Sequence, residues 1–101
     1  MHAGDYHSLE LPFVFDHQWP PLVHDFTPTE KKLANTFTLY WSNMAKYGTP
    51  NGKLDGEIEW PVYNKSTDMN IFLEHPTKVG AHLQAETCDF WDVHFQKYYF
   101  D

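Results

Sequence analysis

The feature that most constrains this chain is residues 27–48, where the sequence marks both ends of one amphipathic helix. The side chain of Thr27 can cap the first turn, and Pro28 suits the first helical position because the N–H that it lacks is not needed there. Glu30 follows Thr27 by three residues, so the two side chains can form a capping box. Local chemistry therefore predicts that the helix begins at Thr27.

The same stretch also predicts a buried face and a clear end. Gly48 can adopt the left-handed conformation that ends many helices, and residues 49–52 contain the Pro and Gly of a turn. A helix with one broad apolar stripe must pack on a large surface. The stripe recurs at helical spacing and consists of Leu33, Phe37, Tyr40, Trp41 and Met44.

The other expected elements are shorter. The run Leu9–Phe15 is apolar, but Pro12 weakens a strand there to an edge strand or an irregular segment. Residues 17–26 include two consecutive prolines and are expected to form a loop. Residues 53–68 are expected to run irregularly over the surface. Within what reads as one domain we predict strands at residues 70–74 and 78–82 and a carboxyl-terminal helix at residues 83–97.

Aromatic residues make up 18% of the 101 residues. This is a heavy load for a small domain, which buries only about two-thirds of its unfolded surface. The mismatch suggests that a partner surface is missing. Trp41 and Trp91 lie on apolar helical stripes, so we assign them to a core rather than to the wall of a substrate gorge. The side chains expected to face the missing surface are Phe37, Trp41, Phe90, Trp91 and Phe95.

Charge and residue spacing exclude several classes of protein. The net charge of −7 argues against a nucleic-acid or anionic membrane partner. No apolar run reaches the roughly twenty residues of a transmembrane helix, and residues 1–10 lack the basic and apolar regions of a signal peptide, so targeting signals give no localisation. The seven histidines show no zinc-ligand spacing, and we expect neither a metal nor another cofactor. No Gly-x-Ser-x-Gly elbow occurs in the sequence, so the nucleophile of a serine hydrolase is not in it.

Four segments follow one another in a recognisable order: GDYHSLELPFVF, FTPTEKKLANTFTLYWSNMAKYGTPNG, EWPVYN and CDFW. Together they resemble the carboxyl-terminal part of the type-B carboxylesterase family, which includes the cholinesterases and has the α/β-hydrolase fold. The most specific matches are His-x-x-Glu followed by Phe-Val-Phe, the run Tyr-Trp-Ser-Asn-Met-Ala-Lys-Tyr-Gly-Thr-Pro-Asn, and Trp-Pro-x-Tyr. The resemblance implies a partial α/β domain, 1–101, with a histidine loop, a long helix, one or two edge strands and a carboxyl-terminal helix.

The resemblance puts the catalytic histidine at His7. Such hydrolases carry their triad in the chain order nucleophile, acid, histidine, so the serine, the acid and the oxyanion-hole donors would lie upstream of Met1, in the missing amino-terminal part of the fold. The resemblance also implies that the complete protein acts on a small-molecule ester and has a secretory location. It implies that this chain alone has no activity. Glu10 is implied to be a structural hydrogen-bonding residue near the site, not the triad acid. Ser8 stands where the family usually has glycine and adds a side chain beside the reacting site.

Two further residues carry expectations. Cys88 lies in the CDFW segment, and we predict that it pairs with an upstream cysteine in the complete protein; the alternative is a buried free thiol. Asn64-Lys65-Ser66 matches the N-glycosylation sequon, which has meaning only if the protein enters the secretory route.

Two other interpretations stay open at this point. One is a degenerate cholinesterase-like domain used for adhesion or protein interaction, since the fold supports binding without catalysis. The other is an independent small α+β domain whose likeness is incidental. An upstream Gly-x-Ser-x-Gly with an acid would favour the esterase, and loss of that motif would favour the binding protein.

Overall fold

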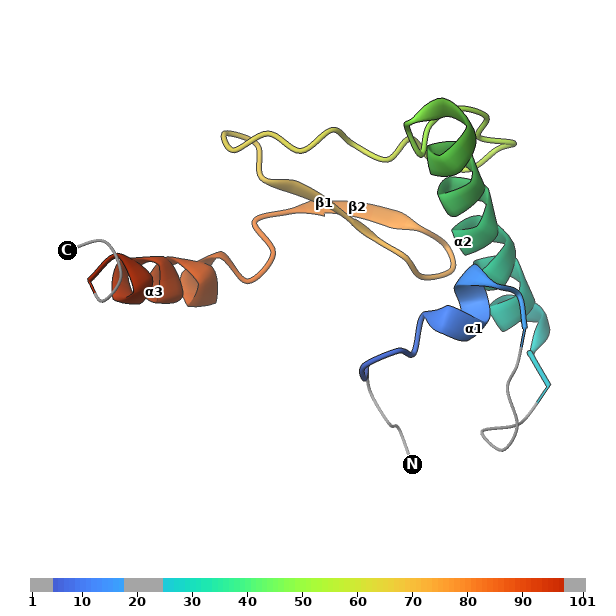
Figure 1. Ribbon diagram of the computed structural model, residues 1–101, viewed down its shortest axis with the longest axis horizontal. Helices are drawn as coiled ribbons and strands as arrows, with labels where there is room; N and C mark the ends of the chain where they lie inside the picture. The colour runs from blue at the N-terminus through green and yellow to red at the C-terminus, as the bar shows by residue number, and fades with distance from the viewer. Residues whose placement is uncertain (1–4, 18–24, 98–101) are drawn as a thin grey trace.

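The computed structural model describes residues 5–17 and 25–97 (Figure 1). Most of the loop expected at residues 17–26 lies outside the described residues. In chain order the elements are α1 (Leu11–Val14), α2 (Pro28–Tyr47), β1 (Met69–Phe72), β2 (Lys78–Ala81) and α3 (Ala85–Phe95).

Helix α2 begins and ends where the sequence predicts. The Oγ1 of Thr27 accepts a hydrogen bond from the backbone N–H of Glu30 at 3.2 Å, and Oε2 of Glu30 accepts one from the backbone N–H of Thr27 at 2.8 Å. These two bonds are the capping box. At the other end Gly48 has a φ of 71° and donates its N–H to the carbonyl of Met44. Both predicted ends are confirmed.

The run Leu9–Phe15 contains a short helix, so the expectation of an edge strand or irregular segment is wrong. Pro12 lies in the first turn of α1, where its missing N–H costs nothing. The backbone carbonyl of Glu10 accepts hydrogen bonds from the N–H groups of Phe13 and Val14 at 3.0 and 2.9 Å. The proline that argued against a strand is equally suited to beginning a helix.

Helix α1 packs on the first half of α2 through aromatic rings. The ring centroid of Phe13 lies 5.2 Å from that of Phe26 and 5.8 Å from that of Phe37. Phe37 is only 7% exposed. The expectation that Phe37 faces a missing surface is therefore wrong, because α1 covers it. The Nζ of Lys31 lies 2.6 Å from Oδ1 and 2.5 Å from Oδ2 of Asp16, and this ion pair contributes about 1 kcal/mol or less because both side chains remain in contact with solvent.

A polar face of α2 holds the segment that follows the helix, residues 49–60, which we call the strap. Thr36, Tyr40 and Asn43 are buried and succeed one another along this face by four and three residues. Asn43 donates from Nδ2 to the carbonyls of Pro50 and Lys53, at 2.9 and 2.8 Å. The amide of Asn43 therefore fixes the turn at the start of the strap.

The middle of the strap is held by the other two side chains. Thr36 Oγ1 donates to Oε1 of Glu57 at 2.9 Å, and the hydroxyl of Tyr40 donates to the carbonyl of Ile58 at 2.6 Å. Burial raises the pKa of the Tyr40 hydroxyl above its usual value, and the nearby charge of Glu57 raises it further. The neutral phenol, which is the form that donates, is therefore favoured in the folded chain.

The side chain of Asn51, near the start of the strap, is hydrogen-bonded to the backbone of Trp60 at its end. Its Nδ2 donates to the carbonyl of Trp60 at 2.8 Å, and its Oδ1 accepts from the N–H of Trp60 at 2.7 Å. The indole of Trp60 is thereby laid against α2, where its centroid lies 5.3 Å from that of Tyr40 and 6.3 Å from that of Trp41. The strap is irregular, as predicted, but side-chain hydrogen bonds define its path.

Strands β1 and β2 pair with each other as an antiparallel hairpin, with Met69 opposite Ala81. Both predicted strands are confirmed, although β1 begins one residue earlier than predicted and both strands end earlier. The chain leaves β1 after Phe72, because the N–H of Glu74 bonds back to the carbonyl of Phe72 at 3.0 Å. It leaves β2 at His82, whose φ of 56° is left-handed.

Helix α3 forms as predicted but is shorter than residues 83–97. Gln84, just before it, has a left-handed φ of 52°, so the helix begins only at Ala85. Among the described elements α3 packs on no other helix or strand, and it stands apart at one end of the molecule (Figure 1). Trp91 is 50% exposed and Trp41 40%, so a core around these two tryptophans would have to include the missing surface, and their assignment to it stays a prediction.

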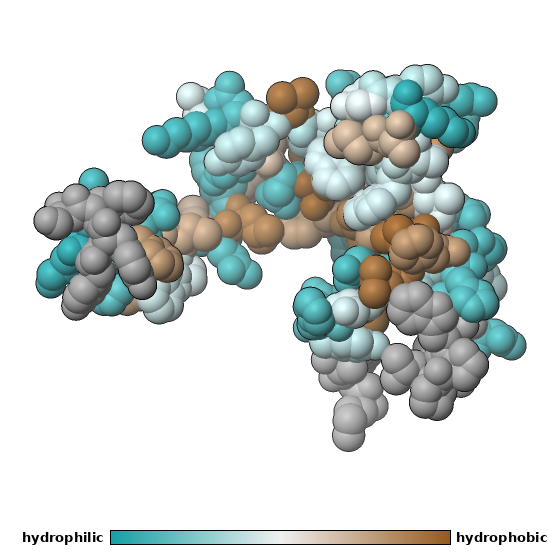
Figure 2. Space-filling view, in the orientation of Figure 1, coloured by the Kyte–Doolittle hydropathy of each residue, from teal (hydrophilic) through white to brown (hydrophobic). Residues whose placement is uncertain are grey.

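The chain exposes far more surface than a compact domain of its size. Its accessible surface is 8284 Å², whereas a compact protein of this mass exposes about 5,900 Å². Its radius of gyration is 16.9 Å, against about 13 Å for a globular domain of 100 residues. Apolar side chains gather at several separate places on the face shown in Figure 2. The expectation that Trp41, Phe90, Trp91 and Phe95 are left uncovered is confirmed.

We expect Asn43→Ala to release the strap. The substitution leaves two backbone carbonyls without their donor and should lower the free energy of unfolding by about 2–3 kcal/mol. Chemical denaturation would measure this loss, and amide hydrogen exchange would show it first in residues 49–60. Asn35→Ala, at an exposed position of the same helix, is the matched control and should change stability by about 0.5 kcal/mol or less. Equal effects of the two variants would contradict the role of Asn43.

Candidate functional site

His7, the candidate catalytic residue, lies in a tight turn just before α1. The N–H of Leu9 bonds to the carbonyl of Tyr6 at 3.1 Å, so His7 and Ser8 are the two central residues of a β-turn. Ser8 has a φ of 72°, the positive value that the third residue of a type II turn adopts. His7 is solvent-exposed. The imidazole is therefore presented at the tip of a defined turn.

Ser8 occupies a backbone conformation that favours glycine. An L-residue at this φ places its Cβ close to a backbone carbonyl, at a cost of about 1 kcal/mol or more. The turn itself thus gives a physical reason for the glycine that the resemblance associates with this position. The carbonyl of Ser8 accepts a hydrogen bond from the N–H of Leu11 at 3.3 Å, which joins the turn directly to α1.

Glu10 contributes its backbone rather than its carboxylate to this region. Its carbonyl accepts the first hydrogen bonds of α1, while its side chain is exposed and makes no hydrogen bond with any described residue. His7 also makes no hydrogen bond or ion pair within the described ranges. An imidazole can take a proton and return it, but it needs a nucleophile and an orienting partner to do so productively. The described part of the chain brings neither of them to His7.

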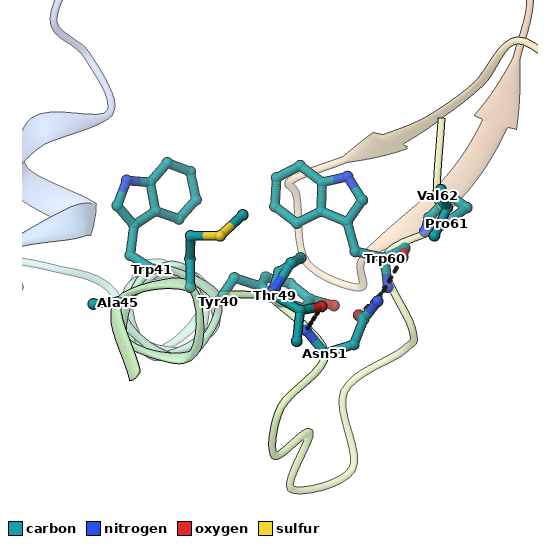
Figure 3. Close-up of a pocket in the computed structure, with 10 residues that line it drawn as sticks. Tyr40, Trp41, Ala45, Thr49, Asn51, Trp60, Pro61 and Val62 are labelled. Atoms are coloured by element: carbon teal, nitrogen blue, oxygen red, sulfur yellow. Dashed lines mark hydrogen bonds between the residues drawn. The ribbon is translucent and has the colours of Figure 1, made fainter. Parts of the chain in front are cut away.

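An apolar groove between α2 and the strap is a second feature, which the sequence interpretation missed. Its volume is about 570 Å³, and Figure 3 shows the indole of Trp41 on α2 and the indole of Trp60 on the strap, which project in the same direction. The sequence signals were the Trp60-Pro61 pair and the helical stripe, but nothing in their spacing brings them together. The groove is lined by Tyr40, Trp41, Met44, Ala45, Thr49, Pro50, Asn51, Trp60, Pro61 and Val62.

The groove has the chemistry of a binding surface rather than of a reaction centre. Its one titratable side chain, Tyr40, is engaged with a backbone carbonyl, and the amide of Asn51 is used by Trp60. No Ser, Cys, His, Asp or Glu lines it. Among the described residues, no three His, Cys, Asp or Glu side chains form a group that could hold a metal ion.

The two remaining candidate residues are both on the surface. Cys88 is free and exposed on α3 in this chain, and its predicted pairing with an upstream cysteine concerns the complete protein, so it stays a prediction. Asn64 is exposed in the turn that precedes β1. Neither residue contacts the His7 turn through any hydrogen bond in the described ranges.

Residues 1–91 match the sequence model of the carboxylesterase family. The chain belongs to this family. Membership implies the α/β-hydrolase fold, and the helices and two-stranded antiparallel sheet described above are consistent with part of it. The resemblance predicted from the sequence is therefore confirmed, and the interpretation of the chain as an unrelated small domain is wrong.

Relatives support the same conclusion and set the scale of the match. Acetylcholinesterase 1 of Caenorhabditis briggsae is 30% identical over 100 residues, which cover 90% of this chain and 16% of that protein. Cholinesterase of Mus musculus is 32% identical over 95 residues, covering 93% and 16%. Cocaine esterase of Homo sapiens is 34% identical over 85 residues, covering 84% and 15%. This carboxylesterase-family chain thus spans about a sixth of the length of the curated relatives it matches.

None of the helices in the described part of the chain is both long enough and apolar enough to cross a membrane.

We expect Ser8→Gly to stabilise the His7 turn slightly. Glycine removes the left-handed strain of about 1 kcal/mol, but it also adds freedom to the unfolded chain, which offsets about 0.5 kcal/mol or more of that gain. Ser8→Val, with a β-branched side chain at the same φ, should be destabilising by comparison. Denaturant unfolding of both variants would measure the difference.

Ser42→Gly is the matched control for this prediction. Ser42 lies inside α2, where the same change should destabilise the chain by about 0.5 kcal/mol or more because glycine is a poor helix former. If Ser8→Gly and Ser42→Gly were destabilising to the same extent, the strain assigned to Ser8 would be absent.

Proposed function

We propose that this chain is the carboxyl-terminal part of a serine carboxylic-ester hydrolase and that His7 is its triad histidine. Membership of the carboxylesterase family is the observation that carries the proposal. The His-x-x-Glu followed by Phe-Val-Phe supports the choice of His7 among the seven histidines. Its exposed position at the tip of a turn is compatible with contact to a substrate.

In the proposed reaction, a serine outside this chain attacks the carbonyl carbon of a carboxylic ester. The imidazole of His7 takes the serine proton during the attack and returns it to the leaving alcohol, and the same ring then activates water to release the acid. An acid outside this chain orients the ring. Glu10 would not serve as that acid. Its backbone carbonyl accepts the first hydrogen bonds of α1, and its carboxylate is exposed and does not cap the helix.

We therefore expect the isolated chain to have no esterase activity. The sequence has no Gly-x-Ser-x-Gly elbow, and the chain spans 16% of the acetylcholinesterase and cholinesterase relatives. The serine, the acid and the oxyanion-hole donors would come from the rest of the fold, which would also cover the exposed faces of α2 and α3. By the likeness to cholinesterases we place the complete protein in the secretory route. No observation favours the adhesion interpretation.

His7→Ala, made in the esterase that contains this segment, should lower kcat by several orders of magnitude. Loss of the general base leaves only the oxyanion hole and substrate binding to accelerate the reaction. Stability should change by about 1 kcal/mol or less, because the side chain is exposed and makes no hydrogen bond in the described ranges. Steady-state kinetics with an activated ester would measure the first effect, and thermal unfolding the second.

Two controls accompany this prediction. Glu10→Gln should reduce activity much less than His7→Ala if Glu10 is not the triad acid. The 101-residue chain alone should hydrolyse an activated ester no faster than free imidazole and should take no serine-directed organophosphorus label. Near-normal turnover of the His7→Ala enzyme would refute the histidine assignment, and stoichiometric labelling of the short chain would refute the missing nucleophile.

Cys88 is expected to form a disulfide with a cysteine of the rest of the protein. In this chain it is free and exposed on α3, so the thiol is accessible to a partner without unfolding the helix. Peptide mass mapping of the complete, non-reduced protein should find Cys88 linked to a second cysteine peptide. Alkylation of Cys88 without prior reduction would exclude the bond and weaken the secretory assignment.

A further inference from the structure

The turn before β1 combines a modification motif with the geometry that such a motif needs. Asn64-Lys65-Ser66 is the one Asn-x-Ser/Thr triplet in the sequence. All three residues are exposed, as are their neighbours Tyr63 and Thr67. The acceptor amide and the hydroxyl that accompanies it are therefore both on the surface.

The acceptor side chain is held in place through its oxygen. The Oδ1 of Asn64 accepts a hydrogen bond from the N–H of Ser66 at 2.8 Å, and the backbone carbonyl of Asn64 accepts one from the N–H of Asp68 at 2.6 Å. No described residue accepts a hydrogen bond from its Nδ2. The nitrogen that would be modified is thus the free end of an otherwise fixed amide, and its modification would break no hydrogen bond of the folded chain.

The surroundings of the turn leave room for a large hydrophilic group. The turn lies at the outer edge of the molecule, where the chain reverses between the strap and β1 (yellow in Figure 1). That corner is largely hydrophilic in Figure 2, in contrast to the exposed aromatic faces of α2 and α3. A glycan there would be hydrated.

We infer that Asn64 is an N-glycosylation site of the complete protein. The cell's oligosaccharyltransferase would join Nδ2 of Asn64 to the anomeric carbon of an oligosaccharide carried on a lipid pyrophosphate. The bond between that carbon and the pyrophosphate oxygen breaks, the amide loses one proton, and the lipid pyrophosphate is released. This inference rests on the secretory location proposed above, and it adds that the 64–67 turn stays free surface when the rest of the fold is present.

The test uses the complete protein that contains this segment, expressed in a eukaryotic secretory cell with a carboxyl-terminal tag that carries one Asn-Gly-Thr acceptor. The tag reports entry into the lumen. Peptide-N-glycosidase removes the glycans and converts each glycosylated Asn to Asp, which peptide mass spectrometry detects. In the unchanged protein, Asn64 and the tag asparagine should both be converted.

Matched variants separate the acceptor from its surroundings. Asn64→Asp keeps the oxygen that accepts from Ser66 and removes the nitrogen, whereas Ser66→Ala keeps the backbone donor and removes the hydroxyl. Each variant should carry one glycan fewer than the unchanged protein, and Lys65→Ala should carry the same number. An unmodified Asn64 beside a glycosylated tag, or no loss of a glycan in Asn64→Asp, would overturn the inference. His7→Ala should not alter the count, so failure of the esterase proposal and failure of this one are distinguishable.

Discussion

Three buried hydrogen-bonding side chains on one face of α2 carry much of the structure. Thr36, Tyr40 and Asn43 hold the strap by its backbone or by Glu57, with donor–acceptor distances of 2.6–2.9 Å. Each would be costly to bury without its partner. Because the strap has no regular secondary structure, these bonds are what replaces a ladder of backbone pairs. The same hydrogen bonds hold the strap beside α2, so that the groove lies between them and the strap ends at Trp60 next to the helix.

The surface balance indicates what the chain lacks. It exposes 8284 Å², roughly 2,400 Å² more than a compact protein of its mass, and a standard interface buries only about 800 Å² on each partner. This much additional accessible surface is typical of one part of a larger hydrophobic core, and it is more than a single docking interface would cover. The family supplies the reason, since the chain spans about a sixth of its curated relatives. The high aromatic content indicates the same deficit, although the prediction was wrong for Phe37, which α1 covers.

Local chemistry was predictable from the sequence, and long-range pairing was not. The capping box and Gly48 give the bounds of α2 because each signal involves residues within one turn of the helix. The short α1 was missed because Pro12 suits both a strand edge and a first helical turn, and the helix packs through Phe13 on residues later in the chain, Phe26 and Phe37. The attachment of the strap to α2 was missed for the same reason, since nothing local shows that Asn43 donates to the carbonyl of Lys53. The importance of His7 came from the family motif, while the positive φ of Ser8 came only from the structure.

The position of the proposed catalytic histidine depends on packing that contains no catalytic group. His7 is fixed by a two-residue turn, the turn is bonded to α1 through Ser8, and α1 is held by Phe13 against Phe37 of α2. Loss of the Phe13–Phe37 contact would therefore let the imidazole of His7 move, although neither phenylalanine contacts it through a hydrogen bond. Catalysis is sensitive to a displacement of about 1 Å. In this interpretation the chain contributes one proton-transfer group and the scaffold that aims it. The left-handed φ of Ser8 strains the backbone. This strain lies in the same turn that sets the direction of the His7 side chain.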